Sequence, residues 1–116
     1  MSKKVRKINN NGPRFEMNPF KSTGIRYNKM DMYSSKVVAH NVKYSDLYNY
    51  VEKQRKKLAK NHPSAKMNIA IKYRSMSKPI SAGYFDVSGE SDLIAPYDYQ
   101  DEDDNIDAIY IQVAGI

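Results

Sequence analysis

The chain has 116 residues, of which 41% are hydrophobic and 28% are charged, so it can support one domain but not two independent cores. It contains no cysteine, which excludes disulfides, thiolate metal ligands and a cysteine nucleophile. No stretch approaches the roughly 18 apolar residues of a membrane span, and the N-terminus lacks the apolar run of a signal peptide. We therefore expect a protein of the cytoplasm or nucleus, or a component of a virion, with no membrane partner.

The charges are divided unevenly along the chain. Residues 1–62 hold 15 basic and 4 acidic residues, whereas residues 63–116 hold 4 basic and 9 acidic residues. Opposite signs in two halves are typical of chains whose basic part binds nucleic acid, or whose copies associate head to tail. The sequence therefore predicts two kinds of partner. One is other protein chains of an assembly, including copies of this chain, and the other is RNA or DNA.

Residues 1–44 show no sustained hydrophobic period. The segment opens with a basic cluster and continues with a run of turn-forming residues between Asn9 and Pro13. Isolated aromatic and methionine side chains follow, as in an arm that contacts other molecules rather than a free coil. We predict a long, extended, basic N-terminal arm with little regular structure, apart from one short strand near residues 37–42.

The clearest predicted element is a helix over residues 45–60. The Ser45 hydroxyl can accept a hydrogen bond from the free amides of the first turn. Leu47, Val51 and Leu58 recur at helical spacing, and lysines in the last turns complement the negative end of the helix dipole. The chain reaches a proline soon afterwards, which ends the helix.

Three strands are predicted after the helix. In residues 66–74 every second side chain from Met67 to Tyr73 is large and apolar, and the others are polar apart from Ala70, so one face belongs to a core and the other is cationic. Residues 80–87 form the second strand, in which Gly83 indicates a bulge or a close backbone approach. Residues 106–113 form the third. The fold class is therefore α+β, with a small antiparallel sheet of roughly 3–4 strands covered by one helix in a core over residues 45–116.

The basic residues of the arm and of the helix end are the strongest functional signal. Lysine and arginine neutralise phosphates and release counterions, which requires positive charge and reach but no particular spacing. Aromatic residues interleave with them in the arm, where nucleic-acid bases could stack. The predicted nucleic-acid-binding residues are Lys3, Lys4, Arg6, Lys7, Arg14, Lys21, Arg26, Arg55, Lys56, Lys57, Lys60, Lys72 and Arg74.

An acidic segment resembles the start of a calcium-binding loop in its spacing. The oxygen ligands would come from Asp101, Asp103, Asn105 and Asp107. Ile106 stands where such a loop requires glycine, and Gln112 stands where it requires glutamate, so we expect a charged surface loop and no metal site. A small metal-dependent adapter or enzyme that uses this loop is the third functional hypothesis.

The chain lacks the parts of a recognised active site. His40 and His62 are the only histidines, and neither has neighbours that form a triad or a metal-ligand spacing. There is no phosphate-binding glycine loop. We therefore expect no catalytic activity and no cofactor.

The first functional hypothesis is a non-catalytic structural component of a large nucleoprotein, viral or phage assembly. Its basic arm would contact nucleic acid or neighbouring chains. The alternative is an autonomous small nucleic-acid-binding protein, in which Lys66, Lys72 and Arg74 join the helix lysines in one patch.

Overall fold

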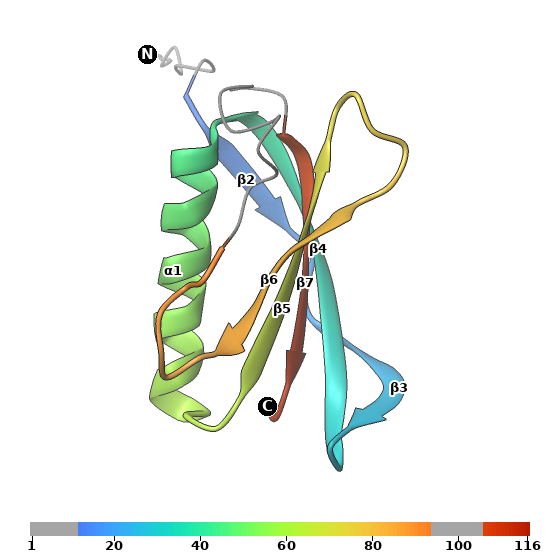
Figure 1. Cartoon of the computed structure of the whole chain (residues 1–116), viewed down its shortest axis with the longest axis vertical. Coiled ribbons are helices and arrows are strands. Elements are labelled where there is room, and N and C mark those ends of the chain that lie inside the picture. Colours follow the sequence, from blue (N-terminus) through green and yellow to red (C-terminus); the bar gives the residue numbers. More distant parts are fainter. Residues whose placement is uncertain (1–11, 94–105) are drawn as a thin grey trace, which may run out of the picture.

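The computed structural model describes residues 12–93 and 106–116. Its elements are β2 (Arg14–Met17), β3 (Lys21–Tyr27), β4 (Met30–Val42), α1 (Tyr44–Asn61), β5 (Lys66–Tyr73), β6 (Ile80–Asp86) and β7 (Ile106–Ala114). Within the described residues, α1 packs on one face of a six-stranded antiparallel sheet (Figure 1). The strand order is β2-β4-β7-β5-β6, and β3 also pairs with β4. The α+β class is confirmed, but the sheet is larger than the 3–4 strands expected.

The additional strands come from the segment that the sequence predicts as an extended arm. β2 and β3 pair one after the other with the same edge of β4, so residues 14–42 form one long, interrupted hairpin. Asn28 and Lys29 close it with φ angles of 50° and 66°, the left-handed pair that a type I′ turn requires. The prediction of little regular structure is therefore wrong for this segment. The basic cluster at residues 3–7 lies outside the described residues.

The helix and the three later strands follow the sequence prediction closely. β5, β6 and β7 each begin and end within one residue of the expected bounds, and the short strand expected near residues 37–42 is part of β4. The helix start differs, because α1 begins at Tyr44. The first-turn contact is made by the carboxylate of Asp46, which accepts a hydrogen bond from the backbone N–H of Lys43 at 3.1 Å. Ser45 is therefore not the N-cap.

The core lies between α1 and one face of the sheet. Met67, Ile69 and Ile71 alternate along β5 and are fully buried, as are Leu47 and Val51 on the inner side of α1. Burying an aliphatic side chain of this size stabilises the fold by about 1.5–3 kcal/mol. The alternation of large apolar side chains with other side chains along β5 thus gives this strand one face in the core and one face outside it.

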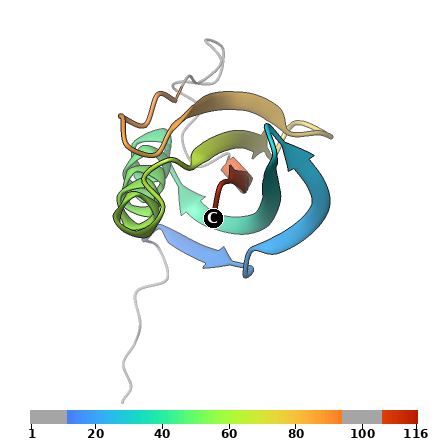
Figure 2. The ribbon, with the colours of Figure 1, turned by 90° about the horizontal axis from the view of Figure 1, so that it is seen from below.

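The other face of the sheet is concave. Figure 2 shows the sheet curling around β7, with β3 to the right of β7, β6 above it, and the two strands approaching each other. β3 and β6 lie at opposite edges of the sheet, yet the rings of Tyr27 and Tyr84 meet edge-on with their centroids 6.1 Å apart. This ring contact joins the two edges above the face that α1 does not cover.

A buried ion pair joins α1 to the segment that follows β6. Arg55 is 7% exposed, and its guanidinium donates two hydrogen bonds, of 2.9 and 2.7 Å, to the carboxylate of Glu52. It also donates to the backbone oxygen of Val87. The same carboxylate accepts hydrogen bonds from the backbone N–H and the hydroxyl of Ser91. The bonds from Arg55 and then from Ser91 lower the pKa of Glu52 to about 2.

Gly83 lets the segment after β6 cross over that strand. A Cβ atom on Gly83 would lie 2.6 Å from the backbone oxygen of Asp92, and the hydroxyl of Tyr44 holds the crossing segment by donating to the backbone oxygen of Leu93 at 3.1 Å. The register between β5 and β6 also shifts next to Gly83. Both features predicted for this glycine, a bulge and a close backbone approach, are confirmed.

Replacing Glu52 by glutamine should lower the free energy of unfolding by about 3 kcal/mol, because Arg55 then stays buried without its counter-charge. Urea denaturation at neutral pH measures this loss. Lys56→Gln is the matched control, because its Nζ lies 3.8 Å from the same carboxylate but its side chain is 69% exposed. The control should change stability by less than about 0.5 kcal/mol. Equal losses in the two variants would contradict the role given to Arg55.

The same ion pair predicts a pH dependence. The pKa of Glu52 in the folded protein is about 2, below its ordinary value of 4.5. The stabilisation by the carboxylate is therefore complete above its ordinary pKa and disappears as the pH falls towards 2. The stability difference between the wild type and Glu52→Gln should shrink between pH 4.5 and 2, and a difference that stays constant over this window would refute the assignment.

Gly83→Ala should destabilise the protein by about 1–3 kcal/mol, because the added methyl group overlaps the backbone of Asp92. Thermal unfolding is a sufficient measurement. Gly89→Ala is the control, because its Cβ would make only an ordinary contact of 3.6 Å with the backbone oxygen of Asp86. If the two variants melt at the same temperature, the segment after β6 does not cross the strand as closely as described.

Candidate nucleic-acid interface

The outward face of α1 carries a row of exposed lysines, which we call the helix lysine stripe. Its members are Lys53, Lys56, Lys57 and Lys60. Lys53 and Lys60 each lie three and four residues from the adjacent Lys56 and Lys57, so all four are on one side of the helix. Like charges three or four residues apart destabilise a helix by about 0.2–0.5 kcal/mol per pair. Within the described residues, only Lys56 has a carboxylate nearby, and that carboxylate belongs to Glu52, which Arg55 already engages.

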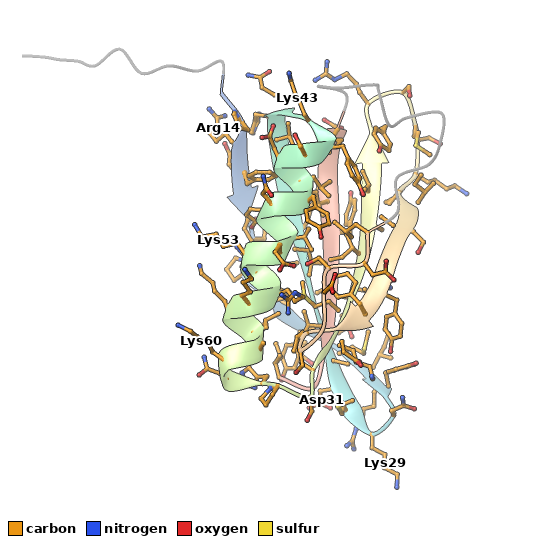
Figure 3. All side chains as sticks on the ribbon, turned by 60° about the vertical axis from the view of Figure 1, so that its left-hand side comes forward. Arg14, Lys29, Asp31, Lys43, Lys53 and Lys60 are labelled. Carbon is orange, nitrogen blue, oxygen red and sulfur yellow. The ribbon has the colours of Figure 1, made fainter. Side chains whose placement is uncertain are left out.

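β2 lies alongside α1 and adds an arginine to the same side of the molecule. The rings of Phe15 and Tyr50 stack with their centroids 4.2 Å apart, which holds β2 against the helix. Figure 3 shows Arg14, Lys53 and Lys60 projecting from this side. Arg14 lies 3.1 Å from the carboxylate of Glu16, so its charge is locally balanced, whereas the lysines of α1 remain largely unbalanced.

The sheet face away from α1 forms a second polar surface, which we call the open-face trough. A hollow of about 640 Å³ lies over β4, β7 and β5 and is bounded by Lys21, Lys36 and Tyr110. A smaller hollow of about 290 Å³, below the contact between Tyr27 and Tyr84, continues it. The two hollows share Asn68 and Gln112, so these amides stand at the centre of the surface.

Hydrogen bonds and charges organise the open-face trough. The side-chain N–H of Asn68 donates to the side-chain oxygen of Gln112 at 2.9 Å. The ammonium group of Lys36 lies 5.9 Å from the ring centroid of Tyr110, within the range of a cation–π contact. Partial burial of the hydroxyl group, together with a hydrogen bond to Tyr27, raises the pKa of Tyr84 from its ordinary value of 10 to about 12.

The single patch expected from the sequence does not form. Lys56, Lys57 and Lys60 come together on α1, as expected, but Lys66 and Lys72 lie on the opposite face of the sheet. These two lysines are also neutralised, because Lys66 pairs with Asp86 and Lys72 lies 3.2 Å from Asp107. The sheet therefore separates the basic helix from the basic strand residues.

Arg55 does not belong to any exposed surface. The sequence assigns it to the basic end of the helix, but it points inwards and is enclosed by Glu52, Val87 and Ser91. Two features of the sequence indicate that Arg55 is buried. It follows Leu47 and Val51 at intervals of four residues, on the inner side of the helix, and Glu52 stands three residues before it as a partner. Arg55 is therefore not available for contact with nucleic acid.

The remaining predicted residues are dispersed. Arg26 lies near the hairpin turn, 3.5 Å from the carboxylate of Asp31, and Lys21 stands at the rim of the open-face trough. Arg74 follows β5 and is exposed. The residues outside the described part of the chain are Lys3, Lys4, Arg6 and Lys7, together with Asp101, Asp103 and Asn105 of the acidic loop.

Several members of the two surfaces were not among the predicted contacts. Lys53 could have been found, because it continues the spacing of Lys56 and Lys57 by one helical turn. Lys36 and Tyr110 could not, because they become neighbours only through the pairing of β4 with β7. The pairing of Asn68 with Gln112 likewise depends on the register between β5 and β7.

No known protein family matches the chain, and no curated protein or solved structure shows significant similarity to it. In the part of the chain that the structure describes, no three His, Asp or Glu side chains gather as metal ligands. α1, the one helix in this part, is not apolar enough to cross a membrane.

Proposed function

We propose that this protein is a non-catalytic structural component of a nucleoprotein assembly, and that it holds nucleic acid by its phosphates through the helix lysine stripe. The observation that carries the proposal is the row of four exposed lysines with almost no balancing acid in the described structure. Such a row costs helix stability when the protein is alone and is stabilised when phosphates lie against it.

The placement of the other charges supports binding through phosphates. Three carboxylates elsewhere in the described structure are paired with cations, in the contacts of Asp31 with Arg26, Asp86 with Lys66 and Asp107 with Lys72. On the outer side of α1, by contrast, four lysines lie together and only Lys56 has a carboxylate within ion-pair distance among the described residues. The four basic residues before Gly12 lie outside the described residues, and their charge would add to the same interaction.

A non-catalytic role agrees with the contacts of the titratable side chains, which connect structural elements. The buried pair of Glu52 and Arg55 has a structural task, since it connects α1 to the segment after β6. His40 lies 3.2 Å from the carboxylate of Glu16 in the pairing of β2 with β4. These titratable groups hold elements together instead of surrounding a reactive atom.

The test is the salt dependence of binding to a fluorescent, 20-base-pair DNA duplex of arbitrary sequence. The logarithm of the association constant should fall steeply with the logarithm of the salt concentration. In the triple variant Lys53→Gln, Lys57→Gln and Lys60→Gln, the magnitude of this slope should decrease by about 2–3, because each phosphate contact contributes about 0.9.

The matched control removes the same number of charges elsewhere. Lys29→Gln, Arg74→Gln and Lys78→Gln change exposed residues of the hairpin turn and of the loop between β5 and β6. This control should keep the wild-type slope. A wild type with a flat salt dependence would reject nucleic acid as the partner of the stripe and would point to an acidic protein surface instead.

A further inference from the structure

We propose that the open-face trough is a second binding site, separate from the helix lysine stripe, for unpaired nucleotides of a single-stranded nucleic acid. In this site the bases would lie on tyrosine rings and on the amide pair, while lysines at the rim would hold phosphates. The inference goes beyond the proposed function, because it concerns the opposite face of the sheet and does not require the stripe.

The strand register aligns the residues of the trough in two rows. The first row runs from β4 across β7 and β5 to β6 and consists of Ser34, Gln112, Asn68 and Tyr84. The second row, one side-chain repeat along the strands, consists of Lys36, Tyr110, Ala70 and Ser81. Each row thus combines an aromatic ring with groups that form hydrogen bonds, and the rows are about 7 Å apart.

The larger hollow of the trough is open because one residue of its floor is small. Ala70 lies between Tyr110 on β7 and Ser81 on β6 and contributes only a methyl group. The resulting hollow of about 640 Å³ is within the range of sites that hold small organic molecules. A larger side chain at this position would fill the hollow from the face opposite the core.

The amide pair offers a donor and an acceptor side by side. Because Asn68 donates to Gln112, the two side chains are held in a fixed orientation. The side-chain oxygen of Asn68 and the side-chain N–H groups of Gln112 make no other hydrogen bond within the described residues. Amide side chains in this arrangement match the donor and acceptor groups on the edge of an unpaired base.

The aromatic and cationic groups favour a nucleotide over a neutral ligand. Tyr84 and Tyr27 are 50% and 43% exposed, which is high for rings of this size, and base stacking on such rings contributes to single-strand binding. Lys21 and Lys36 have no carboxylate within ion-pair distance among the described residues. In the proposed complex, the ammonium group of Lys36 would move from the ring of Tyr110 to a phosphate. A base would then stack on the ring of Tyr110.

A duplex does not suit this surface. Its Watson–Crick base edges are engaged in pairing and its base faces are covered by stacking, so the amide pair could not bind the former and the tyrosines could not stack on the latter. The contact between Tyr27 and Tyr84 also encloses one end of the trough. The trough should therefore distinguish single strands from duplexes, whereas the helix lysine stripe should bind both through their phosphates.

The test compares a 20-nucleotide fluorescent single strand, as DNA and as RNA, with the duplex of the same sequence. Tyr110→Ala should weaken binding of the single strand about 5- to 100-fold, because base stacking on one ring accounts for that range. It should change duplex binding less than about twofold. Tyr48→Ala, on α1 and outside the trough, is the matched control and should leave both affinities unchanged.

Two further measurements keep the test independent of folding defects in Tyr110→Ala. Ala70→Leu fills the trough without touching the core, and it should reduce single-strand binding while leaving the melting temperature of the protein near that of the wild type. In nitrogen-15 NMR spectra, the side-chain amide signals of Asn68 and Gln112 should shift when the single strand is added and should not shift with the duplex.

The outcomes separate the two proposals. If the triple lysine variant weakens binding of both forms and Tyr110→Ala weakens neither, the stripe is a binding surface and the trough is not. If Tyr110→Ala and Ala70→Leu weaken only single-strand binding while the stripe variant changes nothing, the trough stands and the function proposed above fails. Displacement of the strand by micromolar free mononucleotide would also overturn the proposal, because the trough would then serve a small ligand.

Discussion

The register of the central strands β4, β7 and β5 is the constraint on which the rest of the structure depends. Because side chains alternate along a strand, the register that turns Ile69 and Ile111 towards α1 also turns Asn68 and Gln112 to the open face. A slip of one residue in either pairing would bury amides against the helix and expose isoleucines. Core and open-face trough are therefore two consequences of one pairing, and neither can change without the other.

This arrangement gives the two candidate surfaces different physical properties. The helix lysine stripe is convex and carries flexible cations, so it can follow the phosphates of any nucleic acid without regard to sequence. The open-face trough is concave and lined by side chains fixed through strand pairing, so it can select by the shape and hydrogen bonding of a ligand. A protein with both surfaces could hold two segments of nucleic acid on opposite sides of one sheet.

The sequence predicted elements well where a segment has one buried side. β5 and β7 have regular apolar alternation, and α1 has Leu47 and Val51 at helical spacing, so their bounds were close. β3 was missed because all of its residues are exposed, which leaves no hydrophobic period to detect. The basic residues of α1 were found from composition, but Arg55 was misplaced, since its burial depends on Val87 and Ser91, far along the chain. The trough depends on strand order, which no local pattern contains.

The irregular edges of the sheet would matter for the proposed function, in which many copies of the protein gather on nucleic acid. Regular edge strands invite pairing between neighbouring molecules and lead to aggregation. Here the edge formed by β2 and β3 is interrupted at Pro19 and again between Ser22 and Arg26, where Gly24 has a φ of 75°. At the other edge, β6 contains a register shift and is crossed by the segment that follows it. Such edges allow crowded molecules to remain separate folded units instead of merging into a continuous sheet.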